Sequence, residues 1–296
     1  MTAGSISFMT LMQTKLSAYM ALLKIRLSLL VAFSCAFGFT LALPQTDWYR
    51  LLLVFAGAFL LSGASIAINQ ILEKDYDKLM QRTRNRPIPS GKLTEEEAWV
   101  FAGIVMTVSL VLLVAGSNFL TVALSVLSMV LYSFVYTPLK RVGPIAVFVG
   151  AIPGALPPLL GWAAARGEIT YEAWIIFGIQ FIWQFPHFWA IAWVADEDYR
   201  KAGFKLLPCG GRKDLNTAIQ IMIYTLFLLP LGLLPAKFGL TGIDSAIVAT
   251  VCGVLFLAQT FSLMKDGSRK SALRIMFGSF LYLPVVQIAF LLDKVQ

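Results

Sequence analysis

The sequence predicts an all-α membrane protein that crosses the bilayer about nine times. Of its 296 residues, 58% are hydrophobic and only 14% are charged, whereas soluble domains carry about 25% charged residues. Charged or Pro- and Gly-containing breaks divide the chain into apolar segments, most of them close to the ~20 residues that a spanning helix needs. These segments are 27–43, 51–72, 98–116, 118–136, 143–164, 172–194, 216–234, 242–264 and 272–292. We therefore expect one integral-membrane domain, 1–296, in which the segments form a helical bundle.

The positive charges fall very unequally on the two sides of these segments. Twenty of the 24 lysines and arginines lie on the side of the N-terminus. The four on the other side are Arg50, Arg166, Lys237 and Lys294. Cytoplasmic loops retain positive charge, so we expect a cytoplasmic N-terminus and a C-terminus outside. Topology explains the net charge of +8, and no nucleic-acid partner is expected.

Residues 1–26 precede the first apolar run and show no cleavage site of a secretory signal. Their apolar side chains fall on one side of a helix, which predicts a cytoplasmic or interfacial N-terminal segment. These residues are Phe8, Leu11, Met12, Leu16, Tyr19, Leu22 and Leu23. An Arg- and Ser-rich transit peptide is not evident either, which favours a bacterial inner membrane over an organelle.

The stretch NQILEKDYDKLMQRTRNRP, residues 69–87, joins the end of an apolar run to a cluster of arginines. Asn69, Glu73 and Asp77 recur every four residues, so in a helix they share one face, opposite Asp75. Two carboxylates and an amide are oxygen ligands that suit Mg²⁺, which leaves positions for water and phosphate. The cations that follow are Arg82, Arg84 and Arg86. The stretch predicts a metal-plus-arginine site for a phosphorylated ligand at a membrane face.

A second polar group lies in the stretch YSFVYTPLKR, residues 132–141. Tyr132, Tyr136 and Lys140 share a helical face, and Pro138 should loosen the local backbone. These side chains either hold the same anion as the arginines or form an interfacial belt with a snorkelling lysine. Two more cations enter the first span from the same side, and the charge rule alone also explains them: Lys24 and Arg26.

The sixth span combines many aromatic residues with the only histidine of the chain, His187, directly after Pro186. Its aromatic residues are Trp183, Phe185, Phe188, Trp189 and Trp193. They either line a pocket for a large flat ligand or pack within the membrane. An ionisable side chain inside a span suggests function. His187 either binds iron, donates to a ligand or satisfies a backbone group freed by Pro186.

Together with Met80, Thr83 and Pro87, the first acidic stretch has the form NxxxExxxDxxMxRTxxRP. This form resembles the first motif of the UbiA-type intramembrane prenyltransferases, in the branch that farnesylates protohaem IX. The resemblance extends to YTPLKR at 136–141 and to PHFWAIAW, DYRKAG and LP between 186 and 208. It covers residues 20–292.

The resemblance implies a bundle around a cavity that opens laterally to the bilayer and binds farnesyl diphosphate. The residues expected to be catalytic are Asn69, Glu73, Asp77 and Asp198. The cations expected to bind the diphosphate are Arg82, Arg86, Lys140, Arg141, Arg26 and Lys24. Asn69, Glu73 and Asp77 would hold Mg²⁺. The family's second acidic motif usually has two aspartates four apart, but positions 194 and 202 are Val and Ala. Asp196 and Asp198 are the available substitutes as metal ligands.

For the acceptor, the resemblance implies a vinyl group of haem B, with water completing the side chain of haem O. The residues expected at the acceptor are His187, Trp183, Trp189 and Tyr136. The lipid bilayer, and a haem A synthase or terminal oxidase that takes the product, are the further partners implied. Two alternatives stay open: an aromatic prenyltransferase that makes a quinone or chlorophyll precursor, and a transporter. The transporter is disfavoured because the acids cluster at one membrane face rather than near the midplane.

Overall fold

The computed structural model describes residues 8–295, and within them nine helical segments are long and apolar enough to cross a membrane. This confirms the expected number of spans, and their ends differ from the expected ones by only a few residues. The nine are α2 (Ile25–Ala42), α3 (Trp48–Leu72), α5 (Glu95–Gly116), the composite Phe119–Leu139, α8 (Ile145–Arg166), α9 (Tyr171–Val194), α12 (Leu215–Lys237), α13 (Ile243–Asp266) and α14 (Arg269–Leu292). The chain is a multi-pass membrane protein.

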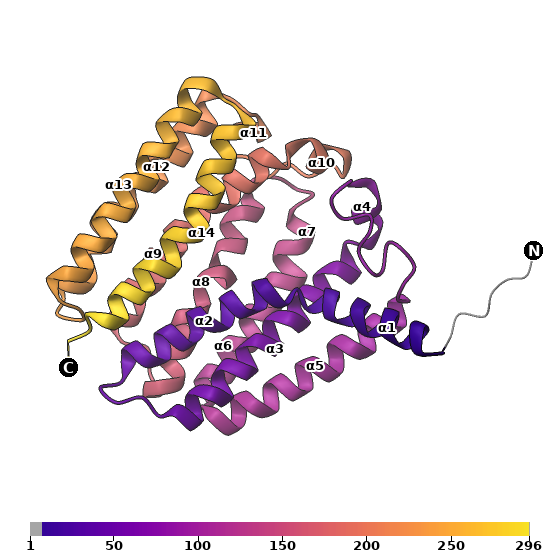
Figure 1. Cartoon of the computed structure of the whole chain (residues 1–296), viewed down its shortest axis with the longest axis horizontal. Helices are drawn as coiled ribbons and strands as arrows, with labels where there is room; N and C mark the ends of the chain where they lie inside the picture. The colour runs from indigo at the N-terminus through magenta and orange to yellow at the C-terminus, as the bar shows by residue number, and fades with distance from the viewer. Residues whose placement is uncertain (1–7, 296) are drawn as a thin grey trace, which may run out of the picture.

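The spans form one bundle in which helices distant in the sequence lie side by side (Figure 1). α2 packs against α3 and α8, and α3 packs against α5. α9 is central to the other half, because it contacts α8, α12 and α14. α14 also contacts α2, so the last span closes the bundle against the first.

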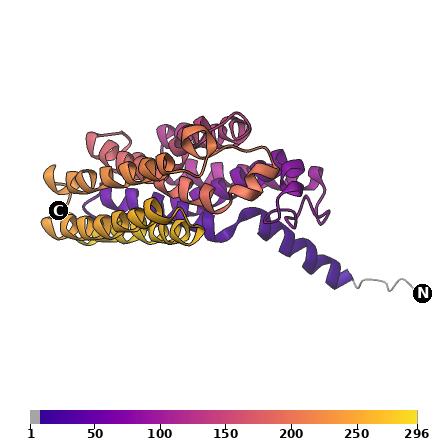
Figure 2. The same ribbon diagram turned by 90° about the horizontal axis from the view of Figure 1, so that it is seen from above.

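The first helix, α1 (Phe8–Leu23), extends away from the bundle (Figure 2). It joins α2 at Lys24, whose φ of 43° and ψ of 58° lie in the left-handed region that non-glycine residues rarely adopt. Two side chains hold this corner: the Gln70 amide donates to the Leu22 carbonyl at 2.9 Å, and the Ser28 hydroxyl donates to the Leu23 carbonyl at 2.7 Å. The corner therefore turns the backbone of Lys24 toward the end of α3.

The fourth span changes its winding part-way across. It consists of α6 (Phe119–Val130), a π-helical turn η1 (Leu131–Tyr136) and the short α7 (Thr137–Leu139). Pro138 has no amide hydrogen for the helical ladder, and π-turns are found mostly as local interruptions of α-helices. After this turn the ammonium nitrogen of Lys140 lies 4.7 Å from the centre of the Tyr136 ring.

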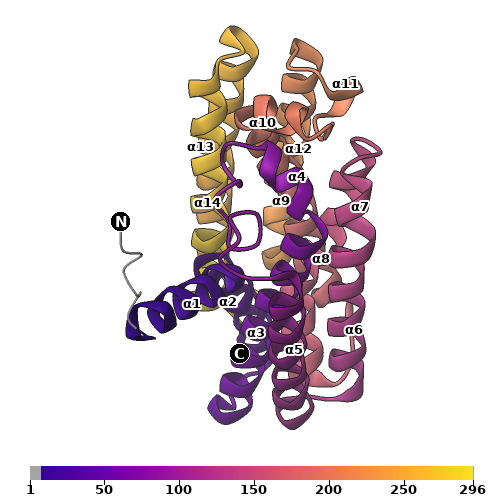
Figure 3. The same ribbon diagram turned by 90° about the vertical axis from the view of Figure 1, so that its right-hand side faces the viewer.

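One end of the bundle, which we call the polar end, carries the loops 73–94, 140–144 and 195–214 and three short helices. These helices are α4 (Lys74–Leu79), α10 (Asp196–Lys201) and α11 (Pro208–Gly211). α4 and α10 lie side by side although more than a hundred residues separate them in the sequence (Figure 3). The polar end thus brings together the two acidic stretches that the sequence singles out.

At the opposite end, three of the four isolated cations cap helix C-termini. Arg50 donates to the carbonyls of Gly116 and Ala164, the last turns of α5 and α8. Arg166 and Lys294 donate to carbonyls at the end of α2. These carbonyls have no partner within their own helix, and a cation also complements the helix dipole there. Arg50, Arg166 and Lys294 therefore stabilise helix ends.

Candidate active site

The acidic ladder Asn69, Glu73 and Asp77 crosses a break between two helices. α3 ends at Leu72, Glu73 is non-helical (φ −99°, ψ 4°), and α4 follows. The amide of Glu73 still donates to the Asn69 carbonyl at 3.0 Å, and that of Asp77 to the Glu73 carbonyl at 2.8 Å. The three side chains therefore stay on one side of the chain and are buried, while Asp75 is exposed on the other.

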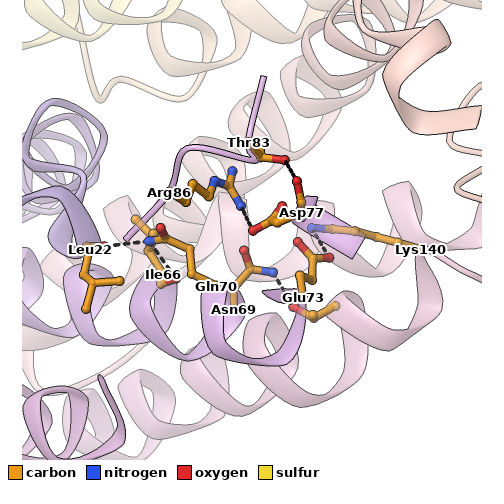
Figure 4. A network of polar contacts seen from close by, with 10 residues as sticks. Leu22, Ile66, Asn69, Gln70, Glu73, Asp77, Thr83, Arg86 and Lys140 are labelled. Atoms are coloured by element: carbon orange, nitrogen blue, oxygen red, sulfur yellow. Dashed lines mark hydrogen bonds and ion pairs between the residues drawn. The ribbon is translucent and has the colours of Figure 1, made fainter. Parts of the chain in front are cut away.

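Each carboxylate of the ladder has a basic partner from another part of the chain (Figure 4). Lys140 Nζ lies 2.8 Å from Glu73 Oε1, and Arg86 Nη1 lies 2.6 Å from Asp77 Oδ2. Figure 4 shows these cations flanking the ladder from opposite sides. The third member of the ladder is held by a hydrogen bond, because Asn69 Nδ2 donates to the hydroxyl of Thr137. The structure thus joins the 69–87 and 132–141 stretches in one charged cluster.

Burial and charge act in opposite directions on the ionisable groups of this cluster. Burial raises the pKa of the Asp77 carboxyl above its usual value, although the Arg86 guanidinium opposes this. Burial alone would lower the pKa of Lys140, but the Glu73 carboxylate, together with Tyr132, reverses the effect and raises it. An added cation would therefore favour the charged form of Asp77.

Lys24, at the corner between α1 and α2, also faces this cluster. Its pKa is lowered to about 7, first by burial and then by the positive charges of Arg86, Arg82 and Lys140. Lys24 is thus placed within electrostatic range of three of the cations expected at the anion site. Arg26 is exposed, and among the described contacts none joins it to this cluster.

The second acidic stretch lies nearby but has other partners. Both carboxylate oxygens of Asp198 accept hydrogen bonds from backbone amides, those of Gln81 at 3.1 Å and Arg82 at 3.0 Å. Asp196 Oδ2 lies 3.0 Å from Arg200 Nε and 3.5 Å from Lys213 Nζ. Among the described residues, no group of three or more His, Cys, Asp or Glu side chains is arranged to hold a metal.

Comparisons with known proteins establish the family of this chain. Residues 31–283 match the model of the UbiA prenyltransferase family. The chain belongs to this family. It is a prenyltransferase. The chain is 52% identical over 285 residues to the protoheme IX farnesyltransferase of Cytophaga hutchinsonii. This match covers 96% of this chain and 100% of the relative. It is 43% identical over 279 residues to the enzyme of the same name from Flavobacterium psychrophilum, with 92% of both chains covered.

Solved structures share the fold at lower identity. A digeranylgeranylglyceryl phosphate synthase superposes with a TM-score of 0.77 at 21% identity, covering 94% of this chain and 98% of that one. A UbiA homolog from Archaeoglobus fulgidus bound to GPP and Mg²⁺ superposes with a TM-score of 0.62 at 17% identity, covering 92% of this chain and 99% of that one. These likenesses support the helical arrangement described above.

The ladder of this prenyltransferase fits a magnesium ion. In the described part of the chain, Asp77 Oδ1 is buried and accepts no hydrogen bond, while Oδ2 binds Arg86. A buried carboxylate oxygen without a partner is costly unless a cation or a donor meets it. The amide nitrogen of Asn69 is engaged by Thr137, which leaves the amide oxygen as its remaining ligand atom. Carboxylate and amide oxygens are the ligands Mg²⁺ prefers.

The aromatic residues of α9 divide between two faces of that helix. Trp183 stacks on His187 at a centroid distance of 4.4 Å, and Trp183 Nε1 donates to the Ser279 carbonyl of α14. Trp189 instead packs against Tyr224 of α12, with ring centroids 5.0 Å apart. The fourth residue expected at the acceptor, Tyr136, contacts Phe188 and Lys140. The structure therefore brings Trp183 and His187 together and places Trp189 elsewhere.

Several residues that support the site were not singled out from the sequence. Gln70 holds the α1–α2 corner, Thr137 orients Asn69, and Ser279 contacts His187. Tyr76 and Tyr199 lie under the guanidinium groups of Arg141 and Arg82, at 4.1 and 5.9 Å. For Gln70, Thr137 and Ser279 the available signal was polarity in or next to apolar runs, since buried polar side chains need partners. That signal marks the residues but not the partner each one finds.

Two hollows lie outside this cluster. One, of about 340 Å³, lies between α1 and residues 85–92, and the other, of about 10 Å³, lies between α2, α9 and α14. The laterally opening cavity that the family resemblance implies stays a prediction.

Proposed function

We propose that this prenyltransferase transfers the farnesyl group of farnesyl diphosphate to a vinyl group of protohaem IX (haem B), giving haem O and diphosphate. The observation that carries this choice of acceptor is the 52% identity, over the full length of the relative, to a protoheme IX farnesyltransferase. The cation-rich cluster at the end of the spans supports a diphosphate as the donor's leaving group. An aromatic prenyltransferase is the alternative.

The proposed diphosphate site consists of the ladder and the cations around it. Asn69, Glu73 and Asp77 would hold Mg²⁺, which neutralises charge on the departing diphosphate. Arg86 and Lys140, beside the two carboxylates, would meet the same oxygens. Further cations that would contribute are Arg82, Arg141 and Lys24. Positive charge fixed where negative charge develops stabilises the transition state of ionisation.

The proposed chemistry then forms one new carbon–carbon bond and adds one molecule of water. The C1–O bond of farnesyl diphosphate breaks, and the electron pair leaves with the diphosphate. The vinyl double bond of haem B attacks C1, which forms the new C–C bond and leaves a cation next to the porphyrin ring. Water adds to that cation and loses a proton, which completes the hydroxyethylfarnesyl group. The apolar and aromatic side chains of α9 would keep other water molecules from the allylic cation.

An acceptor competition tests the proposed function. Purified protein with Mg²⁺ and farnesyl diphosphate is given haem B or 4-hydroxybenzoate, and the products are measured by mass spectrometry. We expect a farnesylated product with haem B, at the mass of haem O. Product with the benzoate alone would contradict the proposal and favour the alternative. A product of haem B lacking the mass of one water would contradict only the hydration step.

We also propose the orientation that the charge distribution predicts, in a bacterial inner membrane with the polar end in the cytoplasm. The polar end carries α4, α10 and most of the cations. The exposed Cys209, in α11 at this end, offers a test in right-side-out vesicles. A membrane-impermeant maleimide should label it only after the vesicles are opened. Equal labelling of intact vesicles would contradict this orientation.

We propose that His187 approaches the haem iron through its Nε2 atom. The hydroxyl of Ser279 donates to the Met276 carbonyl at 2.6 Å, so its single hydrogen is used. Its oxygen, 2.8 Å from His187 Nδ1, must then accept a hydrogen from that atom. This assigns the neutral imidazole with its hydrogen on Nδ1, which leaves a lone pair on Nε2, as metal ligation requires.

Replacing Ser279 with alanine should therefore weaken haem binding by about tenfold, because the partner that fixes the tautomer is lost. His187→Ala should weaken it at least as much and should alter the absorption spectrum of bound haem B. Ser279→Thr keeps the hydroxyl and serves as the control. Affinities come from spectroscopic titration of the purified protein with haem B. Unchanged spectra and affinities in both alanine variants would leave His187 a packing residue.

Lys24 should give diphosphate binding a pH dependence. Its pKa of about 7 means that it is charged below pH 7 and mostly neutral above it in the free protein. We expect the KM for farnesyl diphosphate to rise, relative to that of Lys24→Met, as the pH increases above 7. Lys24→Arg keeps its charge and should lack this rise. The ratio of KM values from pH 6 to 9 measures the effect, and a ratio independent of pH would contradict it.

A further inference from the structure

The two long loops of the polar end are joined by one carboxylate. Asp198 Oδ1 accepts from the amide of Gln81 at 3.1 Å, and Oδ2 accepts from the amide of Arg82 at 3.0 Å. Arg82 and Asp198 are 116 residues apart in the sequence. A carboxylate that accepts from two consecutive amides fixes both position and orientation of that backbone, since charge-assisted hydrogen bonds are the strong ones.

Aromatic contacts reinforce the same junction. Phe204 lies between Tyr76 of α4 and Tyr199 of α10, with ring centroids 5.6 and 6.1 Å away. The guanidinium of Arg82 lies 5.9 Å from the centre of the Tyr199 ring, and that of Arg141 lies 4.1 Å from Tyr76. Cations at such distances from aromatic faces are attracted to them. Tyr199 therefore contacts the side chain of Arg82, while Asp198 binds the backbone amide of Arg82.

The loop that Asp198 fixes leads directly into the charged cluster. Arg82 reaches the cluster electrostatically, because its charge contributes to the lowered pKa of Lys24. Four residues later, Arg86 pairs with Asp77. Asp198 itself has no described contact with Glu73 or Asp77, and its remaining partner is Lys201, 3.5 Å away. Its oxygens are thus directed at the loop rather than at the ladder.

We propose that Asp198 is a positioning residue that sets the place of Arg82 for the diphosphate, and that it acts through backbone amides rather than as a metal ligand. The inference rests on the proposed function, because it assumes a prenyl diphosphate at the ladder. It makes two predictions that a metal-ligand role does not. The loop 81–86 is released when Asp198 is lost even without Mg²⁺, and the effect of losing Asp198 depends on Arg82.

The first experiment needs neither substrate nor metal. Asp198→Ala in the purified full chain, in EDTA, should be cut by trypsin after Arg82 or Arg84 about tenfold faster than the original protein. Asp198→Asn keeps one acceptor and should give an intermediate rate. Glu197→Ala, a change of the exposed neighbouring acid, is the matched control and should not alter the rate. Equal cleavage of all variants would overturn the proposal, whatever acceptor the enzyme uses.

The second experiment is a double-mutant cycle on binding of farnesyl thiodiphosphate. Asp198→Ala should weaken binding about tenfold, with the Mg²⁺ concentration for half-maximal binding unchanged within about twofold. Once Arg82 is alanine, the further change Asp198→Ala should have little effect, because residues that act through one another are not additive. In turnover, KM should change more than kcat. Multiplicative effects, or a shifted Mg²⁺ dependence, would overturn the proposal, whereas failure to farnesylate haem would contradict only the proposed function.

Discussion

Replacing Asp77 with asparagine should lower the kcat of prenyl transfer about 100- to 1000-fold while leaving the chain inserted in the membrane. Asparagine has nearly the same shape, so the packing around this fully buried side chain is preserved. The change removes the negative charge that the proposed Mg²⁺ needs. It replaces one carboxylate oxygen with an amide nitrogen and leaves the other as a neutral carbonyl oxygen. Measurement of turnover with farnesyl diphosphate, haem B and Mg²⁺ tests this, with the amount of protein in membranes as the measure of insertion.

Asp75→Asn is the matched control for this prediction. Asp75 lies two residues away, is exposed on the opposite side and pairs with Lys78 at 3.1 Å. Exposed pairs of this kind contribute little, so turnover should stay within about twofold of the original enzyme. Turnover of Asp77→Asn near that of the original protein would refute a metal role for the ladder. An equal loss in both variants would show that any charge change in α4 disables the enzyme.

The number of spans was predictable because the bilayer imposes it. Hydrocarbon thickness fixes the length of an apolar run, and the backbone must satisfy its own hydrogen bonds there. Departures from a regular helix depend instead on contacts between distant segments. The left-handed corner at Lys24 is held by Gln70. The helix break at Glu73 lies where Lys140, at the end of the fourth span, pairs with the Glu73 carboxylate. No local pattern in the sequence specifies either contact.

The charged cluster was predictable in most of its members, although not in Arg26, and its pairings were not predictable. Spacing of four residues placed Asn69, Glu73 and Asp77 on one side, and the break at Glu73 does not disturb this, since the amide-to-carbonyl bonds continue across it. The partners Arg86 and Lys140 could only be assigned from the structure. Asp198 shows the limit most clearly, because an acid near a site suggests a metal ligand and its observed partners are backbone amides.

The aromatic wall expected on α9 could have been divided from the sequence. Residues four apart, such as Trp183 and His187, share a helical face, whereas residues six apart, such as Trp183 and Trp189, do not. The structure follows this rule, with Trp183 and His187 toward α14 and Trp189 toward α12. Composition indicated an aromatic span, but only the periodicity distinguishes its two surfaces.

Gly161→Ala should prevent α2 and α8 from packing and should destabilise the folded protein by about 3 kcal/mol or more. A Cβ at Gly161 would lie 1.8 Å from the Cys35 carbonyl oxygen, and one at Gly38 would lie 1.9 Å from that of Pro158. The obstructing atoms belong to backbone, so no side-chain rotation can make room. Close approach through small residues is a main way in which membrane helices associate. We expect a thermal midpoint lower by several degrees in detergent, or loss of recoverable protein.

Gly178→Ala is the control, because it makes the same chemical change inside a spanning helix. Gly178 lies within α9, and a Cβ there would meet no atom within 4 Å. Alanine is the better helix former by up to ~1 kcal/mol, so this variant should be as stable as the original or slightly more. Gly38→Ala should reproduce the loss seen at Gly161, since it obstructs the same interface from the other helix. A stable Gly161→Ala protein would show that α2 and α8 can separate without loss of stability. The contacts of α14 with α2 and α9 would then be what closes the bundle.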